Sequence, residues 1–145
     1  MNLFICKVCG HVEFNAAPEN CPVCFAAKEA FNQNDNVFKE SEEKAQEAAV
    51  KHVPSIKVIR ECGLIPEAPC LDVLVRIGET LHPMVDEHFI QFIDCYVDDK
   101  YVSRVLLTPG VHASGLFHLK TVGSKVRIVE VCNLHGHWQA EADIS

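Results

Sequence analysis

Two Cys-x-x-Cys pairs near the start of the chain constrain its fold more than any other feature of the sequence. They are Cys6–Cys9 and Cys21–Cys24, and eleven residues separate the two pairs. Each pair can present two thiolates to one ion, and Gly10, directly after the first pair, permits the positive φ that such a tight turn often needs. The pattern predicts a tetrahedral site of four cysteines, whose ligand type suits zinc or iron.

The segment that carries these cysteines is too small to bury a core of its own, so we expect its folding to depend on the metal. We assign residues 1–36 to this small metal-knuckle domain. Residues 37–50 read as a linker with a short helix at 42–50, because the residues from 32 to 44 are mostly polar and acidic. The remaining residues, 51–145, form the larger domain.

Beyond Pro54 the sequence changes to alternating, β-branched runs separated by turn residues, which is the pattern of antiparallel strands. The expected strands lie at 55–61, 71–77, 88–97, 101–107, 115–121, 125–132 and 136–143. Turn residues such as Asp98, Asp99 and Gly123 separate several of them. The spacing predicts an all-β fold, a seven-stranded immunoglobulin-like β-sandwich or barrel that follows the small cysteine domain.

Charge and hydropathy exclude several classes of function. The formal net charge is −7 and Lys and Arg form no cluster, whereas binding to nucleic acid needs several cationic contacts. The first residues lack the basic stretch of a signal peptide, and no run approaches 18 apolar residues, so we expect neither export nor a membrane span. The expected location is the cytoplasm, where the eight cysteines favour metal ligation over disulfides.

Five potential metal ligands of the larger domain stand in three short segments, 51–54, 82–88 and 132–136. They are four histidines and one cysteine, namely His52, His82, His88, His135 and Cys132. In order and in local spacing, residues 51–138 resemble the superoxide reductases, the family that includes desulfoferrodoxin and neelaredoxin. The resemblance covers the whole ligand set, so it predicts both the fold and the chemistry of this domain.

The resemblance implies a mononuclear iron that cycles between ferrous and ferric states, with four equatorial histidines and Cys132 as the axial thiolate. The position opposite the sulfur is then open to superoxide, which takes up one electron and two protons to become hydrogen peroxide. Lys51 stands where the family has a lysine that attracts the anionic substrate and orders a proton-delivering water. Val50 stands where many members have a capping glutamate, so we expect an oxidised site without a carboxylate cap.

The small domain has a resemblance of its own. Its sequence from Phe4 to Gly10, together with Pro18, the second cysteine pair and Lys28, resembles the rubredoxin-like domain of rubrerythrins. This implies a second iron that relays electrons, although zinc occupies the same ligands well. The two resemblances together imply a rubredoxin-type electron donor and a homo-oligomer, either a dimer or a tetramer.

The other histidines and cysteines are expected outside both sites. A single histidine in a β domain is usually a surface or core residue, which we expect for His11, His112, His118 and His137. Unligated cysteines are often buried, and we expect core or turn positions for Cys62, Cys70 and Cys95, with a disulfide between the first two as an alternative. We expect Trp138 to pack beside the iron site, and Asp86 and Glu87 to be solvated.

Two other classes of function compete with the reductase. The larger domain could hold a metal for storage, sensing or electron transfer without catalysis, or the chain could be an interaction protein with a zinc ribbon and an immunoglobulin-like fold. Dismutation of superoxide is a rival within the enzyme class, and a reductase differs from it by needing an external electron for each turnover. Lys51 and the implied open coordination position favour the reductase.

Overall fold

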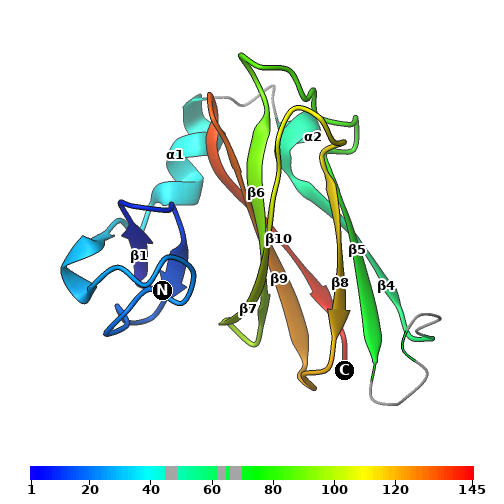
Figure 1. Cartoon of the computed structure of the whole chain (residues 1–145), viewed down its shortest axis with the longest axis horizontal. Helices are drawn as coiled ribbons and strands as arrows, with labels where there is room; N and C mark the ends of the chain where they lie inside the picture. The colour runs from blue at the N-terminus through cyan, green and yellow to red at the C-terminus, as the bar shows by residue number, and fades with distance from the viewer. Residues whose placement is uncertain (45–48, 62–64, 66–69) are drawn as a thin grey trace.

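A small three-stranded sheet opens the chain and stands beside a larger β-sandwich (Figure 1). The computed structural model describes residues 1–44, 49–61, 65 and 70–145. The small sheet is antiparallel with the order β2-β1-β3, formed by β1 (Leu3–Cys6), β2 (Val12–Phe14) and β3 (Phe31–Gln33), and a 3-10 turn, η1 (Lys28–Ala30), precedes β3. The first Cys-x-x-Cys pair therefore starts where β1 ends.

The sandwich consists of a four-stranded and a three-stranded antiparallel sheet. The first has the order β10-β9-β6-β7 and is built from β6 (Ile90–Val97), β7 (Lys100–Leu106), β9 (Lys125–Cys132) and β10 (Gly136–Asp143). The second has the order β4-β5-β8 and is built from β4 (Pro54–Ile59), β5 (Leu71–Ile77) and β8 (Ser114–Leu119). All seven expected strands are present, and their ends differ from the expected ones by at most two residues.

The main core lies between these two sheets. Alternate residues of β5 and β8, among them Val73, Val75 and Phe117, face Ile93 and Ile128 from the other sheet. Over the described residues the two sheets share no ladder, so the sandwich is confirmed and the barrel alternative is not. The alternation that the sequence shows is therefore the inward and outward alternation of a two-layer fold.

The expected linker is more regular than its composition suggested. A helix, α1 (Val37–Lys44), begins five residues before the predicted start, and a second short helix, α2 (Ala49–His52), leads into β4. Helix α1 buries Val37, Phe38 and Ser41, and it packs against β10. Its acidic residues form its solvent face, so the polar composition of this segment is that of an amphipathic helix. No described helix has the length and apolarity needed to cross a membrane.

A second core joins the small sheet to the outer face of the larger one. Leu3, Val12 and Phe14 of the small sheet pack with α1 and with two sandwich residues, Tyr96 and Val129. All of these side chains are buried. The small unit therefore packs against the sandwich through a buried apolar cluster that is separate from the main core.

Candidate metal centres

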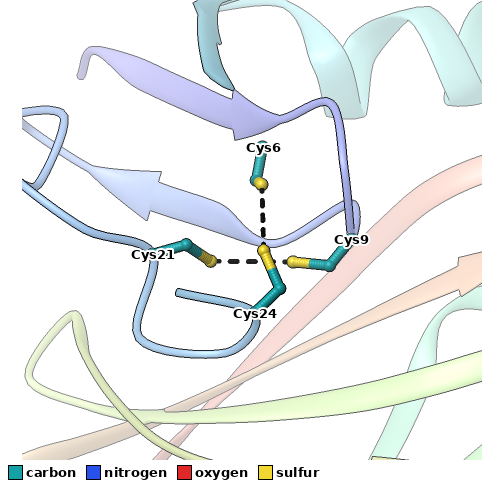
Figure 2. Close-up of side chains that lie close together, drawn as sticks. All are labelled: Cys6, Cys9, Cys21 and Cys24. Carbon is teal, nitrogen blue, oxygen red and sulfur yellow. Dashed lines mark hydrogen bonds between the residues drawn. The ribbon is translucent and has the colours of Figure 1, made fainter. Parts of the chain in front are cut away.

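Four sulfur atoms converge in the small unit. Cys6 and Cys9 come from the end of β1, and Cys21 and Cys24 from the facing loop (Figure 2). The sulfurs of Cys6 and Cys24 are 3.6 Å apart, as are those of Cys9 and Cys21. Four sulfurs at tetrahedral corners about 2.3 Å from one ion would be about 3.8 Å apart. The four cysteines therefore have the geometry of a closed tetrahedral site.

Both cysteine pairs use the same backbone turn. The amide of Gly10 donates to the carbonyl of Cys6 (2.8 Å), and the amide of Phe25 donates to the carbonyl of Cys21 (2.9 Å). Gly10 has the expected positive φ, +79°, but Phe25 also adopts one, +66°. Phe25 is 77% exposed, so its side chain meets no packing clash while its backbone takes a conformation that usually favours glycine.

The second cluster lies at one end of the sandwich and draws on four parts of the fold. His52 is the last residue of α2, and His82 and His88 belong to the connection between β5 and β6. Cys132 ends β9, and His135 lies in the turn to β10. The pairing of β4 with β5 and of β6 with β9 brings these segments together. All five side chains named from the sequence thus meet in one place.

The four imidazoles form a square with the sulfur beside it. Neighbouring rings have centroids 4.5 to 5.0 Å apart, in the order His52, His82, His88, His135, whereas the diagonal from His52 to His88 is 6.2 Å. The Cys132 sulfur lies 3.5 Å from Nε2 of His82 and 3.8 Å from Nδ1 of His135. Together the four imidazoles and the sulfur would offer five donors to one ion.

The spacing of the donor atoms fits a transition metal. Nε2 of His52 lies 3.1 Å from Nε2 of His82 and 3.2 Å from Nδ1 of His135. Two nitrogens about 2.1 Å from one ion and at right angles would be about 3.0 Å apart. In addition, Nε2 of His88 is buried and has no hydrogen-bond partner among the described residues. A buried imidazole nitrogen that no protein group satisfies is suited to bind a metal.

Burial favours the neutral, metal-binding form of two of the imidazoles, those of His82 and His88. It lowers the pKa of His82 to about 4, with the neighbouring histidines adding to the effect. It also lowers the pKa of His88, to which His135 and Lys51 contribute. Burial raises the pKa of the Cys132 thiol, while backbone N–H groups of the following turn act in the opposite direction. A bound cation would convert that thiol to the thiolate.

Hydrogen bonds and stacking orient the ligands. Nδ1 of His82 donates to the carbonyl of Pro83 (2.7 Å), which leaves Nε2 directed at the centre of the cluster. Trp138 is 2% exposed, donates from Nε1 to the carbonyl of His135 (3.0 Å), and stacks on the ring of His52 with centroids 5.0 Å apart. Trp138 thus packs beside the site, as the sequence predicted.

One glycine lets α2 approach this end of the sandwich. Gly78 has φ +88°, and a Cβ atom there would lie 2.6 Å from the carbonyl oxygen of Lys51. The amide of Gly78 donates to the carbonyl of Val53, and the amide of Thr80 donates to that of Val50. Two backbone hydrogen bonds therefore hold the turn after β5 against the segment that carries His52, and only glycine fits at position 78.

Lys51 and Val50 directly precede His52 in α2. Lys51 is exposed, and its charge contributes to the lowered pKa of His88, so the ammonium is within electrostatic reach of the site. Val50 is 50% exposed and offers no carboxylate. Asp86 and Glu87 are exposed, as expected for solvated loop residues. Glu47, the carboxylate three positions before Val50 in the sequence, lies outside the described residues.

The remaining histidines and cysteines follow the sequence expectations unevenly. Cys95 is fully buried in the core, and Cys70 is disulfide-bonded, which favours the alternative, while Cys62 lies outside the described residues. His11 is fully buried, as one of the two expected positions allowed, but its contacts with the carboxylates of Asp94 and Glu13 were not predicted from the sequence. The hydrogen bond from Nε2 of His137 to the carbonyl of Gly10 (2.9 Å) was also missed.

Comparison with known proteins gives matches to both parts of the chain. Residues 42–141 match the family model described as desulfoferrodoxin, and residues 4–32 match that of the rubrerythrin rubredoxin-like domain. A desulfoferrodoxin from Desulfarculus baarsii is 31% identical over 143 residues, which cover 97% of this chain and 96% of the relative. A superoxide reductase from Pyrococcus horikoshii is 31% identical over 106 residues, 65% of this chain and 87% of the relative.

Solved structures give the same picture. The superoxide reductase (neelaredoxin) from Ignicoccus hospitalis is 27% identical, with a TM-score of 0.57 over 74% of this chain and 90% of that one. The superoxide reductase from Treponema pallidum is 20% identical, with a TM-score of 0.61 over 97% and 98%. At that identity the second likeness concerns the fold alone, and it extends over the small unit as well as the sandwich.

Proposed function

Because this chain belongs to the desulfoferrodoxin family, we propose that it is a superoxide reductase. The observation that carries the proposal is the square of four imidazoles with the Cys132 sulfur beside it. We assign His52, His82, His88, His135 and Cys132 to the catalytic iron. Five donors of one octahedron leave one position for a small substrate, which favours reaction at the metal over a purely structural ion.

A ferrous ion bound by these residues would supply the one electron with which superoxide and two protons become hydrogen peroxide. Lys51 attracts the anionic substrate to the rim of the cluster and holds a water that delivers a proton. The buried Trp138 stacks on the ring of His52 and excludes water from that face of the imidazole. Val50 leaves the rim without a carboxylate, so substrate entry meets no competing anionic side chain at that position.

The first test is the metal content and visible spectrum of one sample, reduced and then oxidised. We expect iron in the chain and a broad red or near-infrared band that appears on oxidation and disappears in Cys132→Ser. Cys95→Ala, which changes another buried cysteine away from the cluster, is the matched control and keeps the band. A colourless sandwich without iron would leave a non-catalytic metal-binding or interaction role.

The role of Lys51 is tested by the rate of superoxide reduction. Lys51→Ala should lower the second-order rate constant by about tenfold, because electrostatic steering acts on the encounter step. Lys51→Arg should restore most of that loss, and Lys57→Ala, which removes an exposed cation of β4, should have little effect. If Lys51→Ala and Lys57→Ala lowered the rate constant equally, Lys51 would contribute only to the overall charge of the protein and would have no specific role at the site.

The small unit, residues 1–36, is proposed to hold a second iron or zinc on Cys6, Cys9, Cys21 and Cys24. The helical segment 37–50 and the reductase domain 51–145 complete the proposed division. Exposed apolar side chains beside the cysteines, Val8 (66%) and Phe25 (77%), support a surface on which a rubredoxin-type donor docks. A homodimer or homotetramer in the cytoplasm completes the proposal, and sedimentation of the iron-loaded chain tests the oligomeric state.

A further inference from the structure

The sandwich touches the small unit at one of its metal knuckles. Three side chains of the larger sheet meet the backbone of Cys9 and Gly10. His137 donates to the carbonyl of Gly10 (2.9 Å), and Nη1 of Arg104 donates to the carbonyl of Cys9 (3.0 Å). The ring of Phe92 lies so close that a Cβ on Gly10 would be 3.3 Å from it.

Arg104 is held firmly in this position. Its Nε and Nη2 donate to the two oxygens of Asp94 at 2.6 and 2.8 Å, a bidentate pair. Its guanidinium carbon lies 3.5 Å from the centroid of the Phe92 ring, a cation–π contact. The side chain of Arg104 is 6% exposed and that of Asp94 is fully buried. The third edge of the guanidinium is therefore fixed on the Cys9 carbonyl.

Each member of this junction has a defined partner. Nδ1 of His11 lies 3.2 Å from Asp94, and Nε2 of His11 lies 2.7 Å from Glu13. The hydroxyl of Tyr96 donates to the carbonyl of Val12 (2.6 Å). Asp94 is thus engaged by both His11 and Arg104, and Glu13 by His11, while Arg104 is the member whose donor reaches the carbonyl of Cys9.

Charge gives this contact a consequence for the metal. A divalent ion with four thiolates has a net charge of about −2, and oxidation of iron reduces it to about −1. A fixed cation in a site with little water stabilises the more negative form. Because Nη1 of Arg104 donates to the carbonyl of Cys9 itself, its charge lies within one residue of a sulfur of the four-cysteine site.

We propose that Arg104 is a positioning residue for the four-cysteine site, through which the sandwich fixes the Cys9 knuckle and favours the reduced, more negative metal–thiolate group. The proposal rests on the proposed function only in that the four cysteines hold a metal. It makes the reduction potential of the small unit a property of the junction rather than of the cysteines alone. If the sandwich moved away from the Cys9 knuckle, Arg104 would no longer stabilise the reduced metal–thiolate group.

The test is the midpoint potential of the iron-loaded four-cysteine site, followed by its visible absorption. Arg104→Gln should shift the equilibrium about tenfold toward the oxidised form, which is about 59 mV for a one-electron couple. Arg104→Lys keeps the charge and should recover most of the shift. Tyr96→Phe removes a buried hydrogen bond of the junction without changing its charge, so it should lower the melting temperature and leave the potential unchanged.

Two further measurements keep the result decisive. The double variant Arg104→Gln with Asp94→Asn avoids leaving a buried carboxylate alone, and it should shift the potential in the same direction by a smaller amount. With zinc in the same site, Arg104→Gln should release the metal to a chelator about tenfold faster than the unchanged chain. An unchanged potential and an unchanged zinc release in both variants would overturn the proposal, as would an equal shift in Tyr96→Phe.

Failure of this inference is distinguishable from failure of the proposed function. Arg104 lies at the junction with the small unit and makes no contact with the five ligands of the histidine cluster in any interaction described above. Superoxide consumption by the prereduced unchanged chain therefore tests the function, and the potential of the variants tests the junction.

Discussion

A buried carboxyl group in the core provides the sharpest test of the energetics. Glu130 on β9 is fully buried, and neither of its carboxyl oxygens has a hydrogen-bond partner among the described residues. Ile128 and Cys132 lie two residues away on the same face of the strand, within the main core. Burial raises the pKa of Glu130 well above its ordinary value. The folded protein therefore keeps a proton that the unfolded chain releases.

The sign of the pH dependence follows from this proton. Above the unfolded pKa of Glu130, 4.5, and below its folded pKa, the native state binds more protons than the unfolded state. Stability therefore falls as pH rises, by about 1.4 kcal/mol per pH unit for one group. Glu130→Gln lacks this contribution. Between pH 5.5 and 7.5 its free energy of unfolding should therefore rise, relative to that of the unchanged chain, by up to about 2.7 kcal/mol.

The assay is urea unfolding at pH 5.5, 6.5 and 7.5, with equal metal content and Trp138, the single tryptophan, as the fluorescence reporter. Ionisable groups that are common to both proteins contribute equally and cancel in the difference. Glu61→Gln, at an exposed position, is the control and should stay within about 0.5 kcal/mol of the unchanged chain at every pH. Parallel pH curves for Glu130→Gln and the unchanged chain would refute the reasoning.

Three more outcomes follow from the site. The pKa of His82 is lowered from 6.5 to about 4, so between these pH values the unfolded chain binds a proton that the folded chain does not. The metal-free protein should therefore lose stability as the pH falls from 6.5 to about 4, which urea midpoints would measure. Gly78→Ala should cost at least about 1 kcal/mol, because a Cβ there meets the Lys51 carbonyl at positive φ, while Gly110→Ala, at ordinary φ with its nearest contact at 3.4 Å, should be tolerated in the same unfolding assay. Trp138→Phe should cost about 1 kcal/mol for the lost indole hydrogen bond, measured by urea unfolding followed by circular dichroism because the variant lacks the fluorescent residue, and it should broaden the ferric band.

Local spacing determined the parts of this protein whose residues share one turn or one strand. The ligands in Cys6–Cys9 are held near one another by the chain itself, so their geometry needs little from the rest of the fold. The alternation along β5, β9 and β10 likewise reflects one buried face, and those strands have the predicted bounds. Helix α1 was partly misplaced because its apolar stripe is only two side chains, Val37 and Phe38.

The histidine cluster needed both kinds of information. Its five residues were identified through their resemblance to a family, because no local rule links His52 to His135, 83 positions away. Their convergence depends on strand pairing, and their role as iron ligands stays a proposal. The disulfide-bonded state of Cys70 was raised only as an alternative, since sequence alone fixes no disulfide pairing.

The junction between the two units was decided by tertiary structure alone. Arg104 and Cys9 are 95 positions apart, and His137 and Gly10 are 127 apart, yet each pair shares a hydrogen bond. In the sequence Arg104 is an ordinary charge on a strand, and His137 an ordinary alternating residue. A residue's own neighbours in sequence set its propensity and periodicity, whereas the partner of a buried charge is set by which faces pack together. The cysteine knuckles could therefore be predicted from the chain, and what surrounds them could not.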